Sequence, residues 1–115
     1  RGAGIELRPA LIATSFAGEL GPDELCRLMS EGPAKVFGMW PRKGCLAAGS
    51  DADICVWEPR QRWTIHAAIQ HQNVDHTPYE GFECVGRAHL VYVNGVLAAR
   101  DGEPTGEKPG EFVAR

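Results

Sequence analysis

The first part of the chain shows the apolar spacing and the punctuation of short helices. Pro9 is expected to open an apolar helix over residues 10–16, because proline is favoured in the first turn of a helix. A second helix is expected to begin at Pro22, where two carboxylates follow and suit the positive end of the helix dipole. Its apolar residues recur at the i, i+3 and i+4 spacing of one helix face: Leu25, Leu28 and Met29.

Glycine and proline divide the segment that follows. Gly32 is expected to end the second helix, and Pro33 to open a third, short one. Gly38 is expected to cap the C-terminus of that helix. A corner, Pro41–Gly44, and a polar turn, Gly49–Asp53, then lead into a different kind of sequence.

After this turn the chain consists of short apolar segments separated by turn residues. Ile54–Trp57 is continuously apolar, which suits a strand covered on both faces, and Glu58-Pro59 is expected to end it. Asn94-Gly95 is the preferred pair for a two-residue hairpin turn, because both positions need positive φ. Further short strands are expected over residues 62–65, 84–87, 89–93 and 96–99.

The remaining segments have the composition of loops. Residues 66–78 are polar, with a helical turn expected over His66–Ile69, and the tail from Asp101 is expected to be a surface loop. Helices that precede strands without βαβ alternation predict the α+β fold class. Because a sheet of such short strands has an apolar face, we expect sequence outside this chain to cover it.

Composition narrows the class of protein. The chain has 115 residues, enough for one domain or part of a larger one. A hydrophobic fraction of 43% supports a core, and a net charge of -3 without blocks of like charge argues against nucleic acid or an anionic membrane as partner. No apolar run approaches the ~20 residues that span a bilayer, and no signal-peptide pattern is present. The sequence begins with Arg1 rather than methionine, which indicates either a removed tag or a piece of a longer protein, and we expect the piece.

The four cysteines lie at positions 26, 45, 55 and 84. Their spacing contains no Cys-x-x-Cys pair, which argues against zinc-ribbon and redox motifs. We interpret them as reduced, buried, small apolar residues of a cytosolic protein. A secreted, disulfide-bonded domain is the alternative, which four free thiols on titration under denaturing conditions would exclude.

Candidate chemistry is sparse. Three histidines and an aspartate share one segment, but a spacing of five does not place histidines on one helix face, and the motifs His-Glu-x-x-His and His-x-His are absent. We therefore interpret them as loop residues rather than metal ligands: His66, His71, Asp75 and His76.

Other charged and small residues also favour structural roles. Asp51 and Asp53 lie in a Gly-Ser turn, where aspartate normally bonds its own backbone, and Arg42-Lys43 is expected to be solvated. Gly2 and Gly4 lack the strand and lysine of a phosphate loop, and the three serines lie in no nucleophile elbow. Residue chemistry alone thus offers no self-contained active site.

A family resemblance adds to this interpretation. It rests on the segments Glu31–Gly38, Pro41–Gly44, Gly49–Ile54, Trp57–Pro59, Trp63–Ile65, Asp75–Gly81, Val93–Gly95 and Pro109–Val113. Together they resemble the C-terminal region of cyclic amidohydrolases, the allantoinase, dihydropyrimidinase/hydantoinase and dihydroorotase group of the amidohydrolase superfamily. The Pro-Arg-Lys-Gly, Trp-Thr-Ile and Thr-Pro-Tyr-Glu-Gly motifs are most similar to those of allantoinases, with hydantoinases close behind. The resemblance covers nearly the whole chain.

The resemblance implies a two-part fold, a TIM-like barrel that carries a metal site and a β-sandwich assembled from both chain ends. Residues 1–43 would be the last barrel loop and helices, and residues 44–115 the C-terminal strands and tail of the sandwich. The implied activity is hydrolysis of C–N bonds in cyclic amides by a metal-activated water, with zinc as the implied metal.

The metal ligands of that family have no counterpart in this sequence. They are a His-x-His pair, a carbamylated lysine, two further histidines and an aspartate, and the resemblance implies that this chain starts just after the aspartate. We therefore expect no catalytic residue, metal ligand or cofactor in this segment, which alone would be inactive. One loop, Ala3, Gly4, Ile5 and Glu6, resembles the family's segment whose backbone binds the ring amides; the alternative is a loop that merely starts the next helix.

Two hypotheses for function follow. In the first, the chain is the C-terminal fragment of a cytoplasmic, homo-oligomeric amidohydrolase that acts on a small cyclic amide. In the second, it is a free-standing, β-rich binding or scaffold module that pairs with itself or another chain. An isolated fragment with exposed sheet edges and apolar faces is predicted to dimerise, swap elements or aggregate.

Overall fold

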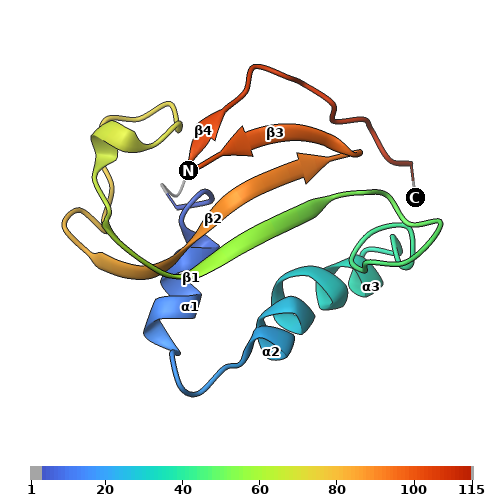
Figure 1. Cartoon of the computed structure of the whole chain (residues 1–115), viewed down its shortest axis with the longest axis horizontal. Coiled ribbons are helices and arrows are strands. Elements are labelled where there is room, and N and C mark those ends of the chain that lie inside the picture. The colour runs from blue at the N-terminus through green and yellow to red at the C-terminus, as the bar shows by residue number, and fades with distance from the viewer. Residues whose placement is uncertain (1–3, 115) are drawn as a thin grey trace. The chain divides into compact units, whose positions relative to one another are not determined.

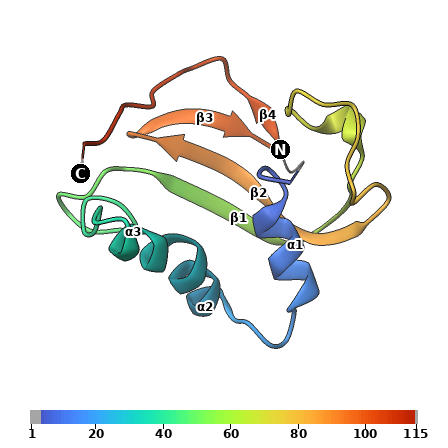
Figure 2. The same ribbon diagram turned by 180° about the vertical axis from the view of Figure 1, so that it is seen from behind.

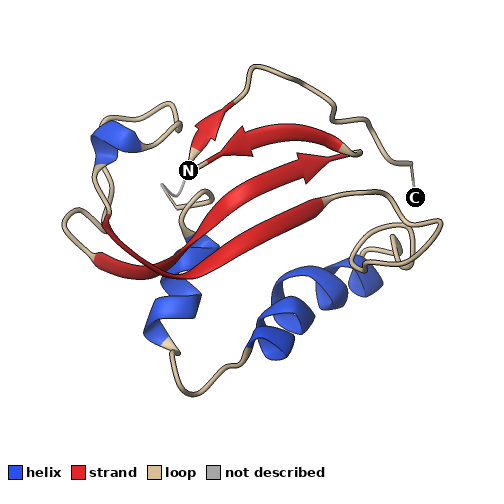
Figure 3. Cartoon of the chain, in the orientation of Figure 1, coloured by secondary structure: helices blue, strands red, loops and turns tan. Residues whose placement is uncertain are grey.

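The computed structural model describes residues 4–114, in which helices precede strands (Figure 1). The helical elements are α1 (Arg8–Ser15), α2 (Pro22–Cys26), the π-helix η1 (Arg27–Glu31), α3 (Gly32–Val36) and the 3-10 helix η2 (Ala67–Ile69). The strands are β1 (Ile54–Thr64), β2 (Glu83–Val93), β3 (Val96–Arg100) and β4 (Glu103–Pro104) (Figure 3). The α+β class predicted from the sequence is confirmed, and so is the helical turn near His66.

The chain divides into two compact units. The first comprises the chain as far as Glu19 together with Glu58–Arg87, and it contains α1 and η2. The second comprises Leu20–Trp57 together with Ala88–Arg115, and it contains α2, η1, α3, β3 and β4. Because the units interleave along the sequence, they do not test the boundary predicted between residues 43 and 44, which stays a prediction.

In the second unit, α2 passes through η1 into α3 as consecutive turns (Figure 2). The prediction that Gly32 ends a helix is wrong: its φ of -58° and ψ of -52° are helical, and its N–H donates to the carbonyl of Arg27, five residues earlier. A Cβ at Gly32 would lie 2.8 Å from that carbonyl oxygen. Glycine at this position therefore permits the wider π turn instead of ending the helix.

The predicted cap of α3 is confirmed. Gly38 has a φ of 70°, in the left-handed region that glycine adopts without steric cost. The N–H of Gly38 donates to the carbonyl of Lys35 at 3.2 Å, and the N–H of Met39 donates to that of Ala34 at 2.8 Å. These two bonds form a Schellman motif and satisfy carbonyls that the end of a helix leaves unpaired.

The strands are fewer and longer than predicted. β1 continues through Pro59, so the prediction that Glu58-Pro59 ends a strand is wrong. In the strand order β1-β2-β3-β4, β1 is an edge strand, where the missing N–H of a proline costs no ladder bond if it faces outward. The prediction that Ile54–Trp57 is covered on both faces also fails in the described structure, since Val56 is 41% exposed.

β2 likewise replaces two predicted strands, since it runs on through Gly86 at a φ of 105°. The indole Nε1–H of Trp63 donates to the carbonyl of Gly86 at 2.9 Å, and the guanidinium of Arg87 lies 4.7 Å from the centre of the Trp63 ring. The irregular point in β2 thus has its own side-chain partner. A continuous strand results although a glycine interrupts the apolar pattern.

The predicted Asn94-Gly95 hairpin is confirmed. Both residues have positive φ, 48° and 77°, and Val93 pairs with Val96 across the antiparallel strands β2 and β3. The tail was predicted as loop throughout, but β4 pairs with β3 at its start. The Thr105 hydroxyl then donates to the carbonyl of Leu97 at 2.7 Å and holds the tail beside β3.

The core of each unit is small. Among residues 4–114, the buried side chains are Leu7, Ala10, Ala34, Ile65, Thr77 and Cys84. Several large apolar residues are exposed instead, including Ile5, Val36, Leu46 and Phe112. No helix within the described residues has the length and apolar character that crossing a lipid bilayer requires.

Candidate functional site

The loop predicted to meet a substrate immediately precedes α1. Ala3 lies outside the described residues. The N–H of Leu7 donates to the carbonyl of Gly4 at 3.1 Å and closes a tight turn, in which the Leu7 side chain is only 1% exposed. Ile5 is 89% exposed. The turn is therefore anchored by Leu7 and presents Ile5 to its surroundings.

Glu6 is held by a residue far along the chain. One carboxylate oxygen accepts the backbone N–H of His71 at 2.9 Å, and the other lies 2.9 Å from Nδ1 of the same histidine. Both oxygens therefore fix the loop that carries His71 against the turn before α1. A substrate-binding role of Gly4, Ile5 and Glu6 stays a prediction.

Residues 66–82 form a loop with a closed neck. The N–H of Ile65 donates to the carbonyl of Phe82 at 2.9 Å, and the N–H of Gly81 donates to the carbonyl of Ile65 at 2.8 Å. Inside the loop, the Glu80 carboxylate accepts the N–H of Ala67 at 2.8 Å and lies 2.8 Å from Nδ1 of His66. Backbone hydrogen bonds therefore close the loop at its neck, and the contacts of Glu80 with His66 and Ala67 hold its two ends together.

The contacts of Glu80 predict a pH dependence of this loop. The hydrogen bond from His66, then that from the Ala67 N–H, lower the pKa of Glu80 below its ordinary value. A lowered folded-state pKa stabilises the fold above the ordinary glutamate pKa, and this contribution is lost as pH falls through the folded value. Carboxyl carbon chemical shifts are expected to give a lower titration midpoint for Glu80 in the folded chain than in the same chain unfolded in urea.

The variant His66→Ala is the matched test of that cause, because it removes the first contact and leaves the bond to Ala67. The Glu80 midpoint is then expected to move toward the value in urea. An equal midpoint in the folded and unfolded chains would show that these contacts do not favour the ionised carboxylate.

The histidines do not converge. His66 pairs with Glu80 and His71 with Glu6, while His76 lies 3.4 Å from its exposed neighbour Asp75. Within residues 4–114, no group of three or more histidine, cysteine, aspartate or glutamate side chains is arranged to hold a metal ion. The interpretation of these histidines as loop residues agrees with their separate carboxylate partners.

Paired charges fix the corner before β1 in the second unit. Lys43 Nζ contacts the carboxylates of Asp51 and Asp53, and Arg42 Nε donates to Asp51 at 2.9 Å. Asp53 also accepts the backbone N–H of Asn94 at 2.9 Å. The prediction that Arg42 and Lys43 are simply solvated is therefore wrong. They join the corner to the turn, and Asp53 joins the turn to the hairpin.

The pKa values of this cluster reflect its hydrogen bonds. Those from Lys43 and Arg42 lower the pKa of Asp51, and those to Asp53 and Asp51 raise the pKa of Lys43. Burial opposes ionisation of Asp53, but Lys43 and the Asn94 N–H outweigh it and lower the pKa of that carboxyl. All three side chains are therefore charged at neutral pH, as a structural ion cluster requires.

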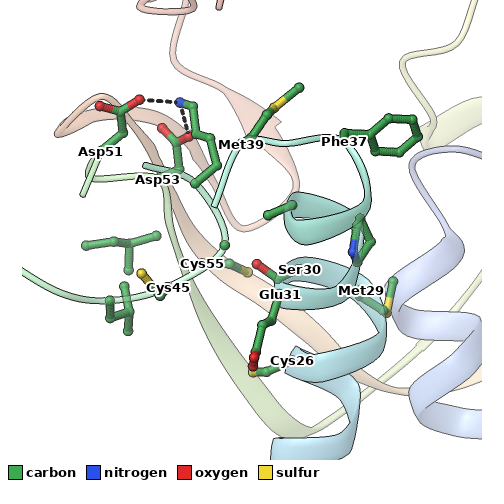
Figure 4. Close-up of a pocket in the computed structure, with 16 residues that line it drawn as sticks. Cys26, Met29, Ser30, Glu31, Phe37, Met39, Cys45, Asp51, Asp53 and Cys55 are labelled. Atoms are coloured by element: carbon green, nitrogen blue, oxygen red, sulfur yellow. Dashed lines mark hydrogen bonds and ion pairs between the residues drawn. The ribbon is translucent and has the colours of Figure 1, made fainter. Parts of the chain in front are cut away.

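An open pocket of about 650 Å³ also lies in the second unit (Figure 4). It is lined from α2, η1, α3, the corner loop and the start of β1. Five of its sixteen lining residues carry sulfur: Cys26, Met29, Met39, Cys45 and Cys55. The interpretation of the cysteines as buried residues holds for Cys84, whereas Cys26 and Cys55 are exposed, and all four thiols are free. Sequence spacing gave no sign of this cluster.

Comparison with known proteins identifies the family. The family model described as "Amidohydrolase family" matches residues 4–98, well over half of the chain. The chain belongs to the amidohydrolase family. The matched range contains the loop before α1, the ion cluster and the sulfur-lined pocket.

The chain is similar to hydantoinases within this family. The chain is 38% identical to D-phenylhydantoinase from Escherichia coli, over 97% of this chain and 25% of that protein. It is 41% identical to D-hydantoinase (dihydropyrimidinase) from Thermus sp., with a TM-score of 0.81 over 89% of this chain and 23% of the other. L-Hydantoinase (dihydropyrimidinase) from Arthrobacter aurescens is 30% identical, with a TM-score of 0.85 over 98% and 25%. The amidohydrolase chain thus spans about a quarter of the length of these relatives.

These matches refine the family resemblance. Similarity to the hydantoinase and dihydropyrimidinase group is confirmed. The expectation that allantoinases are most similar is not supported, because the relatives found are hydantoinases.

Proposed function

We propose that this chain is the C-terminal part of a metal-dependent hydrolase that opens cyclic amides of the hydantoin or dihydropyrimidine type. The observation that carries this proposal is structural similarity to hydantoinases over about a quarter of the length of each, with sequence identity up to 41% and TM-scores above 0.8. Exposed apolar residues such as Val36 and Leu46 support it, since a longer protein would cover them.

The catalytic metal belongs, in this proposal, to the rest of the longer protein. The described residues do not fit a catalytic metal site, because no group of three donors is present among them and the histidines have separate carboxylate partners. This segment therefore supplies no ligand and is inactive alone.

The proposed contribution of this segment to the substrate is the loop Ala3–Glu6. Within its described part, Glu6 is fixed by His71, the turn is anchored by the buried Leu7, and Ile5 is exposed. A loop fixed at both sides holds its backbone groups in one place, which favours binding the amides of a ring. We assign the predicted barrel-derived segment to residues 1–43 and the sandwich strands to residues 44–115.

Compartment and assembly are also part of the proposal. Four free thiols support a reducing, cytoplasmic compartment. The partner is a small cyclic amide, and the longer protein is proposed to be a homo-oligomer, which light scattering on the complete protein would test.

A chimera tests the proposed function. In the Thermus D-hydantoinase, the matched segment is replaced by these residues, and ring opening is measured with hydantoin, dihydrouracil and allantoin. Because the segment lacks the reacting groups, the chimera is expected to retain kcat/KM for hydantoin within about tenfold of the parent enzyme. The isolated chain, with zinc or manganese added, is expected to show no turnover.

Folding and metal content are the controls for the chimera. A chimera that is folded and carries the metal content of the parent, but opens none of the rings, would contradict the proposal. Turnover by the isolated chain would contradict it as well. Faster hydrolysis of allantoin than of hydantoin would overturn the assignment to the hydantoinase type.

A further inference from the structure

The turn between β2 and β3 contains a pair of residues that can react with each other, Asn94-Gly95. Asparagine followed by glycine is prone to spontaneous deamidation, because glycine has no side chain to shield its backbone nitrogen. That nitrogen attacks the side-chain amide carbon of the asparagine, ammonia leaves, and a succinimide ring forms. Water then opens the ring to aspartate or isoaspartate. The hairpin turn therefore holds both groups that the reaction needs.

Contacts with other segments engage both of these groups. The backbone N–H of Gly95, whose nitrogen would attack, donates to the carbonyl of Ala52 at 2.9 Å. The side-chain amide nitrogen of Asn94, which would leave as ammonia, donates to the carbonyl of Pro109 at 2.7 Å. The folded chain therefore engages the attacking nitrogen and the leaving amide at the same time.

A third contact joins this turn to the acidic turn before β1. The backbone N–H of Asn94 donates to the Asp53 carboxylate at 2.9 Å. Because the acceptor is charged, this hydrogen bond is stronger than one between neutral groups. Asp51 belongs to the same ion cluster, where it pairs with Arg42 and Lys43. The two aspartates thus differ in their relation to the hairpin, since Asp53 accepts a bond from its turn.

The contact with Pro109 also positions the tail. After β4 the tail runs back along the sheet to the hairpin turn (Figure 1). An aspartate or isoaspartate at position 94 carries only acceptor oxygens at neutral pH, so its side chain cannot donate to a carbonyl. Its charge would also lie close to that of Asp53, which accepts the N–H of the same residue. Deamidation therefore removes a contact that holds the tail at Pro109.

We propose that Asn94 is a site of spontaneous deamidation. The three hydrogen bonds of the turn suppress the reaction in the folded chain, and its product releases the tail from the hairpin. The bond between the side-chain carbon and nitrogen of Asn94 breaks as the bond to the Gly95 nitrogen forms; water is the only co-reactant, and no electron is transferred. Because the turn must open first, the rate follows the fraction of open chains. The inference is independent of the proposed hydrolase activity.

Mass spectrometry of peptides tests the site in the unaltered chain. The reduced chain is kept in mildly alkaline buffer, either folded or unfolded in guanidinium chloride, and the mass increase from amide to carboxylate is followed with time. Asn94 is expected to react at least about tenfold more slowly in the folded chain, because folding engages both reacting groups. Equal rates in the folded and unfolded chains would overturn the proposal.

The second asparagine of the chain, Asn73, is an internal control. It is exposed, but the β-branched side chain of Val74 shields the nitrogen that would attack. In the unfolded chain Asn73 is therefore expected to react at least about tenfold more slowly than Asn94. Reaction at Asn94 that is no faster than at Asn73 would overturn the assignment of the site.

Two aspartate variants test the protection. Asp53→Ala removes the acceptor of the Asn94 N–H and is expected to speed deamidation of the folded chain about tenfold, because a hydrogen bond to a charged group is lost. Asp51→Ala is the matched control, because it removes a carboxylate from the same ion cluster and leaves the bond between Asp53 and Asn94. Equal rates in the two variants would overturn the proposed protection.

The variant Asn94→Asp tests release of the tail, because it reproduces one product and keeps a residue that tolerates positive φ. Glutamyl endopeptidase is expected to cleave after Glu107 and Glu111 at least about threefold faster than in the unaltered chain, because Pro109 loses its donor. Asn73→Asp adds the same charge in the other unit and is expected to leave cleavage unchanged. Equal cleavage in the two variants would overturn the proposed release.

Discussion

Replacing Gly44 by alanine is expected to destabilise the chain by about 3–5 kcal/mol, a large share of the stability of a small domain. Two costs combine at this position. Gly44 has a φ of 89°, where an L side chain costs about 1–2 kcal/mol. An added Cβ would also lie 2.6 Å from the Ala34 Cβ and 3.1 Å from the Ser30 carbonyl oxygen. Neither neighbour is the flexible end of a side chain, so the backbone itself would have to shift.

Urea unfolding measures this effect, with fluorescence of the three tryptophans as the signal. At a slope of about 1–3 kcal/mol per molar urea, the midpoint of Gly44→Ala is expected to fall by about 2 M. Circular dichroism before the transition shows whether the variant still folds. An unchanged midpoint would mean that the corner does not pack against the helical run as the structure has it.

Gly49→Ala is the control that separates the two costs. Gly49 has nearly the same φ, 92°, but no atom lies within 4 Å of an added Cβ. The backbone cost alone therefore remains, about 1–2 kcal/mol. Equal losses in both variants would assign the whole effect to backbone conformation and contradict the close contact at Gly44.

Charged residues also fix the corner that approaches the helical segment at Gly44. Gly44 in this corner closely approaches Ala34, and its neighbour Lys43 forms ion pairs with Asp51 and Asp53. The corner and the acidic turn are each predicted from the sequence, whereas the expectation that the cations are solvated is wrong. Ion pairs between residues about ten positions apart depend on the conformation of the loop that joins them. Local sequence does not specify that conformation.

Features set by one or two residues were predicted well. Gly38 at the end of α3 and Asn94-Gly95 between β2 and β3 have the positive φ that glycine and asparagine favour, so their local sequence predicts the conformation. Gly32 shows the limit of this approach. The same residue type that ends a helix at position 38 continues one at position 32, because there the missing Cβ makes room for the Arg27 carbonyl.

Strand lengths were predicted less well, because they depend on position in the sheet. Pro59 was expected to end a strand, yet it lies inside β1, which is at the edge of the sheet. An edge strand leaves some N–H groups without a ladder partner, so a proline costs less there than in the centre. Edge position is a property of the folded sheet and not of the residues around Pro59.

The chemically interesting contacts were not predicted, because they join distant residues. Glu6 and His71 are 65 positions apart, and Cys26 and Cys55, which line one pocket, come from a helix and a strand. Spacing rules detect ligands that lie close in sequence, such as Cys-x-x-Cys, and they found none here. The family resemblance supplied the cyclic amidohydrolase group, within which it favoured allantoinases over hydantoinases, but it gave no indication of the sulfur-lined pocket.

Replacing Ile65 by alanine is expected to cost about 3 kcal/mol and to open the loop of residues 66–82. The Ile65 side chain is fully buried, and its backbone bonds Phe82 and Gly81 at the neck of the loop. Removing its outer carbons leaves a cavity in a small core, which typically costs about 2–5 kcal/mol. Urea unfolding is expected to show the lost stability, and hydrogen exchange of the Gly81 amide is expected to become faster.

Ile69→Ala is the matched control, since it deletes the same atoms four residues further along, inside the loop. Ile69 is 42% exposed, so its loss is expected to cost less than about 1 kcal/mol. Comparable losses in the two variants would show that Ile65 is not a core residue of the first unit. A large loss of stability in Ile65→Ala with unchanged hydrogen exchange of the Gly81 amide would instead show that the neck of the loop forms without this core side chain. The His71–Glu6 contact would then depend on the loop itself.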